Sequence, residues 1–353
     1  MPIDFYDFFS GCGGTSQGMQ DAGLSVRMGL DVDPDARDTF KANFPRSDFL
    51  FKDIRCVTRD DVSPYIRQRE NRPLLFGACA PCQPFSRQIH GAAQDDSRRS
   101  LLTEFHRFVE AYLPEYIFLE NVPGLQTVET HDGPFPDFID LLRDLKYFFS
   151  YKVVMAYHYG VPQSRRRLVL LASQLGPIRI PPATHGPGTK NPDLPKVWDW
   201  ISHLPAIRAG DTHARVPNHR AAKLSHLNLR RIAATPVGGD RRDWPEQLEL
   251  DCHKAHSGHT DVYGRMIKHQ PSAALTTRCI SLSNGRFGHP TQNRAISVRE
   301  AACIQTFPMD FIFQGSLNSM ARQVGNAVPV LLAKVIGDSV VRHYSKKTGT
   351  SKA

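Results

Sequence analysis

The sequence predicts an α/β fold, in which helices cover both faces of a sheet, plus a smaller irregular domain. Residues 1 to about 172 alternate short β-rich runs with amphipathic stretches, as expected of parallel strands joined by crossover helices. From about 173, prolines interrupt any long element, and ten of the 15 histidines lie between 185 and 289. After about 295, helical patterns return, and the last of them can rejoin the first domain.

The individual elements follow from the spacing of apolar residues. Six short apolar runs are candidate strands, at 3–8, 27–30, 74–76, 116–119, 152–155 and 168–171. Four segments have the apolar spacing of helices, at 100–111, 135–145, 296–305 and 330–336. These patterns divide the chain into a first domain over 1–172, a second over 173–308, and a segment over 309–353 that returns to the first.

The composition is that of a soluble globular protein, with 41% hydrophobic and 22% charged residues in a chain of 353. We see no apolar run of about 18 residues, so a membrane span is not expected. The amino terminus lacks a basic segment followed by an apolar one, which argues against a secretory signal. Seven scattered cysteines, an odd number, predict free thiols rather than a disulfide framework. We expect a protein that stays inside the cell.

The basic excess is concentrated in one part of the chain. The formal net charge is +9, and residues 173–290 alone carry 16 basic and 9 acidic residues, or +7. A polyanion is the natural partner of such a segment, because neutralised phosphates release condensed counterions. An ordinary solvated basic surface is the alternative.

The first cluster of chemical interest is the glycine-dense turn Asp7–Gly14, between a strand and a helix. Glycines let backbone amides approach a ligand closely. Asp31 follows 20 positions after Gly11, where a carboxylate can accept the hydroxyls of a ribose, and Asp53 can accept an adenine amine. Ser16 replaces the third glycine of a dinucleotide motif, so a nucleoside without a pyrophosphate is favoured. A tight turn with two surface aspartates remains the alternative.

The second cluster is the loop Pro81–Ser86, which follows a strand and contains Cys82. Glu120 and Asn121 follow another strand and can share the same sheet edge. A thiol and a carboxylic acid at one edge indicate covalent catalysis with a nucleophile and a proton donor. Cys79 and Cys82 also form a CxxC pair, which leaves a redox or zinc site as an alternative.

Two further patterns carry charged or metal-binding side chains. Gln163, Arg165 and Arg167 alternate before a strand, so they can point to one side and bind phosphate or a base carbonyl. A structural salt-bridge cluster is equally consistent with them. A metal could use the spacing of Cys252, His253, His256 and His259, but we expect a solvated loop there and no metal.

Six blocks in one order resemble those of the cytosine-C5 methyltransferases that use S-adenosylmethionine. The blocks are Asp7–Gly14, Pro81–Ser86, Glu120–Val122, Gln163-x-Arg165-x-Arg167, Arg299–Glu300 with Gln305–Pro308, and Gln323–Pro329. The resemblance spans both ends of the chain. It implies a Rossmann-like methyltransferase fold with a mixed sheet, catalytic and cofactor-binding residues in 1–172, and a target recognition domain in 173–308.

The resemblance also implies a reaction. The Cys82 thiolate adds to carbon 6 of cytosine, Glu120 hydrogen-bonds or protonates ring nitrogen 3, and Arg165 holds the base through its carbonyl oxygen. Carbon 5 then attacks the sulfonium methyl, and loss of the carbon 5 proton with elimination of Cys82 releases 5-methylcytosine. Because stacking hides the target atoms, the base must leave the duplex, at a cost of a few kcal/mol.

Cofactor and DNA contacts are implied residue by residue. Phe9 stacks on the adenine, Asp31 holds the ribose and Asp53 the adenine amine, while the further cofactor residues are Cys12, Gly14, Val32, Ile54, Leu101, Asn326 and Val328. The residues expected near DNA are Ser86, Arg98, Gln163 and Arg167. In the recognition domain our candidates are Thr276, Thr277, Arg278 and Asn284, for which loop hydrogen bonding is the alternative.

Four positions depart from the family pattern. Cys79 stands where glycine is usual, and Ala274-Leu275 where Thr-Leu is usual, which puts a phosphate contact by that threonine in doubt. Cys303 stands where arginine is common, and Met309 where an acidic residue is common. None of these positions touches the expected chemistry.

The expected partners are double-stranded DNA and, functionally, a cognate restriction endonuclease. We expect no membrane contact, a monomer, and a cytoplasmic prokaryotic enzyme that associates with the nucleoid through DNA. Two alternatives remain open. One is a tRNA cytosine-C5 methyltransferase, against which the long proline-rich 173–290 segment argues. The other is a nucleic-acid-binding module without catalysis, against which Cys82, Glu120 and Arg165 argue.

Overall fold

A computed structural model describes residues 3–68, 70–80, 101–124, 133–251 and 261–349. The chain forms two compact units. Unit 1 comprises residues 1–155, 166–183 and 328–353, and unit 2 comprises residues 156–165 and 184–327. These boundaries differ from the ranges 1–172, 173–308 and 309–353 expected from the sequence. The division into a catalytic and a recognition domain stays a prediction.

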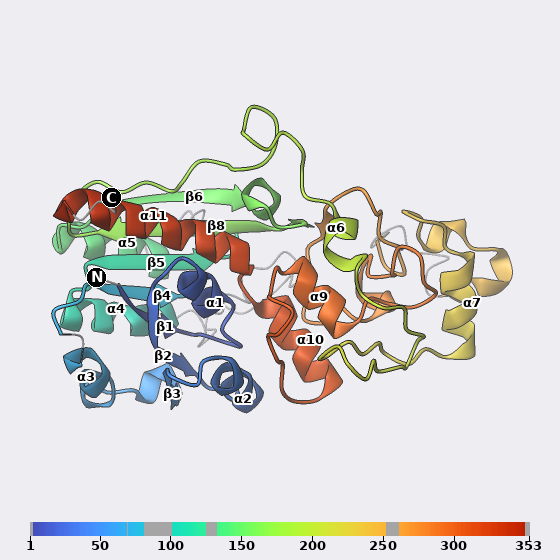
Figure 1. Cartoon of the computed structure of the whole chain (residues 1–353), viewed down its shortest axis with the longest axis horizontal. Helices are drawn as coiled ribbons and strands as arrows, with labels where there is room; N and C mark the ends of the chain where they lie inside the picture. Colours follow the sequence, from blue (N-terminus) through green and yellow to red (C-terminus); the bar gives the residue numbers. More distant parts are fainter. Residues whose placement is uncertain (1–2, 69, 81–100, 125–132, 252–260, 350–353) are drawn as a thin grey trace. The chain divides into compact units, whose positions relative to one another are not determined.

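Unit 1 contains a mixed sheet of seven strands in the order β3-β2-β1-β4-β5-β8-β6 (Figure 1). The strands are β1 (Asp4–Phe8), β2 (Ser25–Asp31), β3 (Asp48–Phe51), β4 (Leu74–Ala78), β5 (Tyr116–Asn121), β6 (Phe148–Met155) and β8 (Arg166–Ser173). The first five pair in parallel, whereas β8 is antiparallel to both β5 and β6. The predicted fold class, with a mixed sheet, is confirmed.

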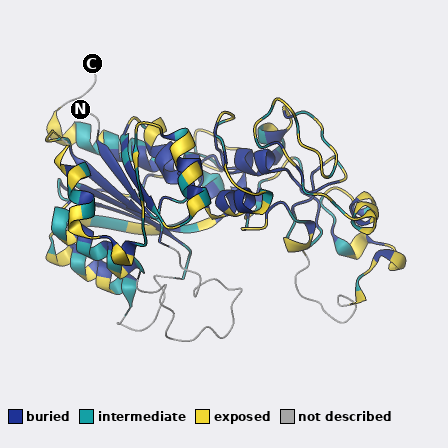
Figure 2. Cartoon of the chain, turned by 90° about the horizontal axis from the view of Figure 1, so that it is seen from below, coloured by how far each residue is buried: buried dark blue, intermediate teal, exposed yellow. Residues whose placement is uncertain are grey.

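Parallel pairing brings the carboxyl ends of β1, β2, β4 and β5 to one edge of the sheet. The register aligns Phe8 with Leu30 and with Ala78, and Ala78 with Leu119. The residues that follow these strands therefore meet at the edge where open α/β sheets bind their ligands. The strands β1, β4 and β5 are buried throughout, as Figure 2 shows for the centre of the sheet.

Helices pack on the sheet of unit 1. They are α1 (Gly14–Asp21), α2 (Pro34–Asn43), α3 (Arg59–Arg67), α4 (Leu101–Tyr112), α5 (Pro134–Asp144) and α11 (Val330–Thr348). An apolar core with Phe105, Phe108 and Phe138 of α4 and α5 joins the sheet. Helices α1 and α11 lie against each other, and a Cβ at Gly18 would meet the Val330 backbone, so only glycine permits this close packing.

Unit 2 is mostly irregular. Its elements are β7 (Gln163–Ser164), α6 (Val197–Ile201), α7 (His226–Ala234), β9 (Ser272–Ala273), α9 (Val298–Ile304) and α10 (Leu317–Asn326). Buried arginines replace much of the missing regular structure: the Arg265 guanidinium donates to the backbone oxygens of Thr235, Ile232, His289 and Gln292. Each such bond satisfies a buried carbonyl that a helix or sheet would otherwise have paired.

The predicted elements agree with the structure in position. All six candidate strands overlap β1, β2, β4, β5, β6 and β8, and the four candidate helices overlap α4, α5, α9 and α11. One stretch is more apolar than the composition led us to expect. In the described residues, the stretch Leu317–Thr348 is long and apolar enough to cross a membrane, although 61% of its most apolar window is buried. Such burial is typical of a core helix, and the stretch is interrupted between α10 and α11.

Candidate active site

The glycine-dense turn after β1 has a backbone that few side chains tolerate. Phe9, Gly11 and Gly13 have φ values of 62°, 51° and 96°. A Cβ at Gly13 would lie 2.5 Å from the ring of Phe44. Phe9 is not a glycine, so its left-handed conformation is strained, as is common where a loop must present a ligand site. The turn ends at Gly14, the first residue of α1, whose N-terminal amides have no side-chain cap.

Asp31 ties the end of β2 to this turn. Its Oδ2 accepts the Gly11 amide at 2.8 Å, and its Oδ1 accepts the amides of Val32 and Asp33 at 2.8 and 3.0 Å. Burial raises the pKa of Asp31, and these amide bonds oppose the rise. Because a carboxylate has about four acceptor positions, capacity remains for a ribose hydroxyl. Gly11 and Asp31, which the sequence spaces 20 positions apart, are thus joined by a direct hydrogen bond.

Asp53 lies after β3, at the start of a short helical turn. Its carboxylate holds the guanidinium of Arg55, with Arg55 Nε 3.0 Å from Oδ1 and Nη2 2.5 Å from Oδ2. The hydrogen bonds from Arg55 hold the pKa of Asp53 below its usual value. An adenine amine would have to share this carboxylate with Arg55.

Asp7 is a buried acid beneath the turn that sequence reasoning did not single out. Its side chain is fully buried, and its Oδ2 accepts the Ser16 hydroxyl at 2.6 Å. Burial raises the pKa of Asp7 to about 7, partly opposed by the bond from Ser16. The hydrogen bond between Ser16 and Asp7 therefore connects the first turn of α1 to β1.

The remaining predicted cofactor residues differ in exposure. Cys12 and Ile54 are buried, Val32 is 60% exposed, and Leu101 packs against the core at the start of α4. Asn326 is the last residue of α10 in unit 2, and Val328 is a buried residue of unit 1.

Three predicted residues, Cys82, Ser86 and Arg98, lie outside the described residues. The chain just before them is described. The side-chain amide of Asn121 donates to the Ala80 carbonyl at 3.1 Å, so the end of β5 holds Ala80 in place. Cys79 lies 3.4 Å from the Thr15 hydroxyl in α1, and burial raises the pKa of its thiol well above the usual value.

Glu120 forms an ion pair at the end of β5. Its Oε1 lies 2.6 Å from Nε of Arg167 on the neighbouring strand β8, and both side chains are largely buried, at 9% and 15% exposed. Sequence reasoning predicted Glu120 and Arg167 as site residues but not that they pair. The two are 47 positions apart, and only the antiparallel β5–β8 register brings them together.

Gln163 and Arg165 belong to unit 2, whereas Arg167 belongs to unit 1. The Arg165 guanidinium donates to the carbonyls of Leu275 and Gly325 at 2.9 and 3.0 Å. Gln163 is fully buried, accepts the Leu275 amide at 2.9 Å, and donates to Gln305 at 3.0 Å. Gln163 lies in β7 and Arg167 in β8, with Arg165 between the two strands, so the prediction that the three residues point to one side stays a prediction.

Comparison with known proteins identifies the family. The sequence matches the model of the C-5 cytosine-specific DNA methylases over residues 3–342. The chain belongs to this family. It is therefore a DNA (cytosine-5-)-methyltransferase, as the sequence predicted.

The methylase has relatives that match it almost from end to end. It is 40% identical over 342 residues to the Type II methylase M.HgiDII of Herpetosiphon aurantiacus, with 95% of this chain and 94% of the relative covered. It is 33% identical over 345 residues to the Type II methyltransferase M1.HphI of Haemophilus parahaemolyticus, with coverages of 97% and 87%.

Solved structures share its fold. A prophage-encoded protein of E. coli superposes with a TM-score of 0.71 at 23% identity, covering 96% of the methylase and 99% of that chain. The Dnmt2 methyltransferase of S. pombe gives a TM-score of 0.65 at 17% identity, with 99% of both chains covered. At such identities the likeness shows the fold alone.

The predicted recognition residues of the methylase lie on one segment of unit 2 and its continuation. Thr277, Arg278 and Asn284 are exposed, and Thr276 is half-buried with its hydroxyl accepting the Arg278 amide at 3.3 Å. The segment is attached to the Gln163–Arg165 loop through the β7–β9 pairing and through Leu275. Sequence spacing could not show this attachment.

Two of the departures from the family pattern turn out to be neighbours. The Cys303 thiol lies 3.7 Å from the Met309 sulfur, and burial raises the pKa of Cys303 to about 11. At these two positions the chain thus has a thiol–thioether contact. Ala274 is exposed. Cys252, His253, His256 and His259 lie outside the described residues, and no group suited to a metal occurs among those described.

Proposed function

We propose that the methylase transfers a methyl group from S-adenosylmethionine to carbon 5 of a flipped-out cytosine in a specific duplex sequence, through a covalent bond to Cys82. The Glu120–Arg167 ion pair is the observation that carries the proposal. It lies at the end of β5, next to the strand whose loop leads through Ala80 to Cys82. A carboxyl group and a guanidinium at one sheet edge suit a pyrimidine ring that must be held and activated.

The cofactor fits the turn after β1. Methylases of this kind generally use S-adenosylmethionine, which supplies an electrophilic methyl group when bound. The strained turn from Phe9 to Gly13 follows β1, and Asp31 retains acceptor capacity for a ribose hydroxyl. We propose that Phe9 stacks on the adenine and that Asp53 accepts its amine by sharing its carboxylate with Arg55.

The chain's own residues then divide the work on the base. Cys82 adds as a thiolate to carbon 6, and Glu120 binds or protonates ring nitrogen 3, which makes carbon 5 nucleophilic. After transfer, the carbon 5 proton leaves and Cys82 is eliminated. Arg167 holds the Glu120 carboxylate in position from β8. The thiol forms and breaks one bond per turnover, so the enzyme is regenerated.

Arg165 and Gln163 receive a supporting role in this proposal. Both are buried, and their polar groups bind the backbone of Leu275 and, for Arg165, that of Gly325. A direct contact of Arg165 with the base carbonyl, or of Gln163 with DNA, needs a rearrangement of these bonds when DNA binds. We propose that they shape the recognition segment that carries Thr276, Thr277, Arg278 and Asn284.

The biological setting follows from the relatives. Because curated relatives at 40% and 33% identity are type II enzymes, we propose that this methylase protects DNA from a cognate restriction endonuclease. We further propose that it acts as a monomer on double-stranded DNA in a prokaryotic cytoplasm, without membrane contact.

A labelled-methyl assay tests the proposal. The protein is incubated with S-adenosylmethionine carrying a labelled methyl group and either duplex DNA or transfer RNA. We expect label in DNA alone, and bisulfite sequencing of DNA from expressing cells then reports the target cytosine and its flanking sequence. Label in RNA alone would favour the tRNA enzyme, and absence of label with retained DNA binding would favour the silent binding module.

A further inference from the structure

A hairpin-like loop over residues 208–223 in unit 2, here called the basic hairpin, has a defined backbone. The Gly210 amide donates to Ala222 O at 3.1 Å, the Ala221 amide to Asp211 O at 3.0 Å, and the His213 amide to His219 O at 2.9 Å. Gly210 has a φ of 89°, which favours glycine where the hairpin begins. The basic hairpin is therefore an ordered element despite the absence of an assigned strand in it.

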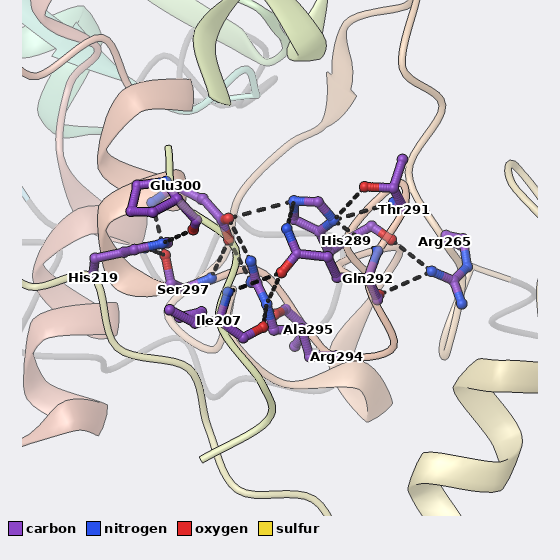
Figure 3. A network of polar contacts seen from close by, with 11 residues as sticks. Ile207, His219, Arg265, His289, Thr291, Gln292, Arg294, Ala295, Ser297 and Glu300 are labelled. Atoms are coloured by element: carbon purple, nitrogen blue, oxygen red, sulfur yellow. Dashed lines mark hydrogen bonds and ion pairs between the residues drawn. The ribbon is translucent and has the colours of Figure 1, made fainter. Parts of the chain in front are cut away.

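Its inner side is anchored to buried groups of the same unit. His219 is fully buried, with Nδ1 2.8 Å from the Ser297 hydroxyl at the start of α9, and Nε2 2.8 Å from Pro205 O (Figure 3). The Asn218 side chain pairs with both backbone groups of Phe313 at 2.9 Å. These bonds fix the tip of the hairpin relative to α9.

Arg299 strengthens the anchor from α9. Its Nε donates to Pro217 O at 2.8 Å, and its amide donates to Asn218 O at 3.1 Å. The Arg299 side chain is fully buried, which makes it part of the interior rather than of a binding surface. A hairpin held this firmly loses little conformational freedom when it binds a partner.

The outer side of the basic hairpin carries exposed cations. Arg208, Arg215, Arg220 and Lys223 are all exposed, and none of them forms an ion pair with a carboxylate among the residues that the structure describes. Asp211 is the one acid between Asp199 and Asp240 in the sequence, and its Oδ2 accepts the Arg208 backbone amide at 2.9 Å. The hairpin thus has a formal net charge of +3.

We infer that the basic hairpin binds the phosphate backbone of the DNA substrate and adds affinity that does not depend on base sequence. The inference rests on the proposed DNA substrate. Guanidinium and ammonium groups on an ordered loop, whose one carboxylate (Asp211) accepts a backbone amide, match the geometry and charge of phosphates. The hairpin differs in this from the recognition segment around Thr276, whose side chains we expect to read base edges.

The test measures how DNA affinity depends on salt. The variants R208Q, R215Q, R220Q and K223Q remove one charge each, and K190Q removes one exposed charge of unit 2 outside the hairpin. Dissociation constants are measured between 50 and 200 mM salt for a duplex containing the target site and for one lacking it. Each lost phosphate contact should reduce the steepness of log K against log salt by about 0.9. Between 50 and 200 mM salt, such a variant should therefore lose about 3.5-fold less affinity than wild type loses.

We expect at least two hairpin variants to lower the slope equally on both duplexes, while K190Q leaves it unchanged. Cofactor affinity and tryptophan fluorescence should stay as in wild type, which shows that the variants fold. The inference would be overturned if all hairpin variants gave the same slope as K190Q, or if their slope changed only on the duplex that contains the target site. If instead wild type transfers no methyl group to any DNA, the proposed function fails, and this outcome is distinct from a failure of the hairpin alone.

Discussion

The buried ion pair between Arg294 and Glu300 provides a sharp test of how unit 2 is held together. Arg294 Nη1 and Nη2 each lie 2.7 Å from a Glu300 carboxylate oxygen, and both side chains are 1% exposed (Figure 3). Glu300 also accepts the Ser297 amide at 2.7 Å, and its Oε1 lies 3.4 Å from His289 Nε2. The perturbation is Glu300→Gln, which keeps the shape and removes the charge.

The expected cost follows from these contacts. Donors face both carboxylate oxygens, so in either orientation the new amide NH2 meets a donor of Arg294. The variant also leaves a buried guanidinium without its counter-charge. Breaking a buried ion pair by removing one partner costs about 3–5 kcal/mol. The folding equilibrium of unit 2 should therefore fall by about two to three and a half orders of magnitude.

The assay uses the natural distribution of tryptophan. All three tryptophans, Trp198, Trp200 and Trp244, lie in unit 2, so their fluorescence during urea unfolding reports this unit. A matched control is Glu104→Gln, which breaks the part-exposed pair with Arg107 on α4 in unit 1. The control should leave the tryptophan transition unchanged. A change below about 1 kcal/mol in Glu300→Gln would refute the view that this network stabilises unit 2.

The stability difference between wild type and the same variant should depend on pH. Burial raises the pKa of Glu300, but hydrogen bonds from Arg294 and His289 outweigh it, and the net pKa lies well below the usual value. A depressed carboxyl pKa stabilises the folded state above the unfolded pKa of about 4.3, and this stability is lost as the pH falls further. The difference in free energy of unfolding between wild type and Glu300→Gln should therefore stay constant from pH 7 to about pH 5 and shrink as the pH falls below about 4. A difference that grows on acidification would contradict the sign.

Three further predictions concern the site and its supports. Because burial raises the pKa of Asp7 to about 7, wild-type stability should fall as pH rises from about 4 through 7, and calorimetry should show this dependence weakened in Asp7→Asn. Gly325→Ala places a Cβ against the Thr276 backbone, so urea unfolding should show a loss of about 1–3 kcal/mol, whereas unchanged stability would exclude the clash. Arg167→Met should abolish methyl transfer with an unchanged tryptophan transition, whereas Arg165→Met should weaken that transition, and the reverse result would exchange their roles.

Much of unit 1 could be predicted from sequence because its strands are continuous buried runs. β5 reads Tyr116–Asn121 and is buried throughout, and α4 has a clear apolar face. By contrast, β3 has four residues with exposed ends, and α3 contains Pro64, so neither gives a clear pattern. Short or proline-containing elements form here because tertiary packing outweighs weak local preference.

The site was predictable in its residue types but not in its pairings. The order of the motifs indicated Glu120, Arg165 and Arg167. The alternation of Arg165 and Arg167 in the sequence, however, cannot show that the chain passes from unit 2 to unit 1 between them. The bonds of Arg165 to Leu275 and Gly325 join positions 110 and 160 residues apart. Such contacts depend on the folded arrangement of irregular loops, for which the sequence has no periodic signal.

The central claim is that the thiol of Cys82 becomes bonded to the target base during methyl transfer. The direct measurement is mass spectrometry of the protein after incubation with S-adenosylmethionine and a duplex containing 5-fluorocytosine at the target position. We predict a stable protein–DNA adduct that maps to the peptide carrying Cys82 and is absent in Cys82→Ala. An adduct at another residue, or none despite methylation of the unmodified duplex, would contradict the account.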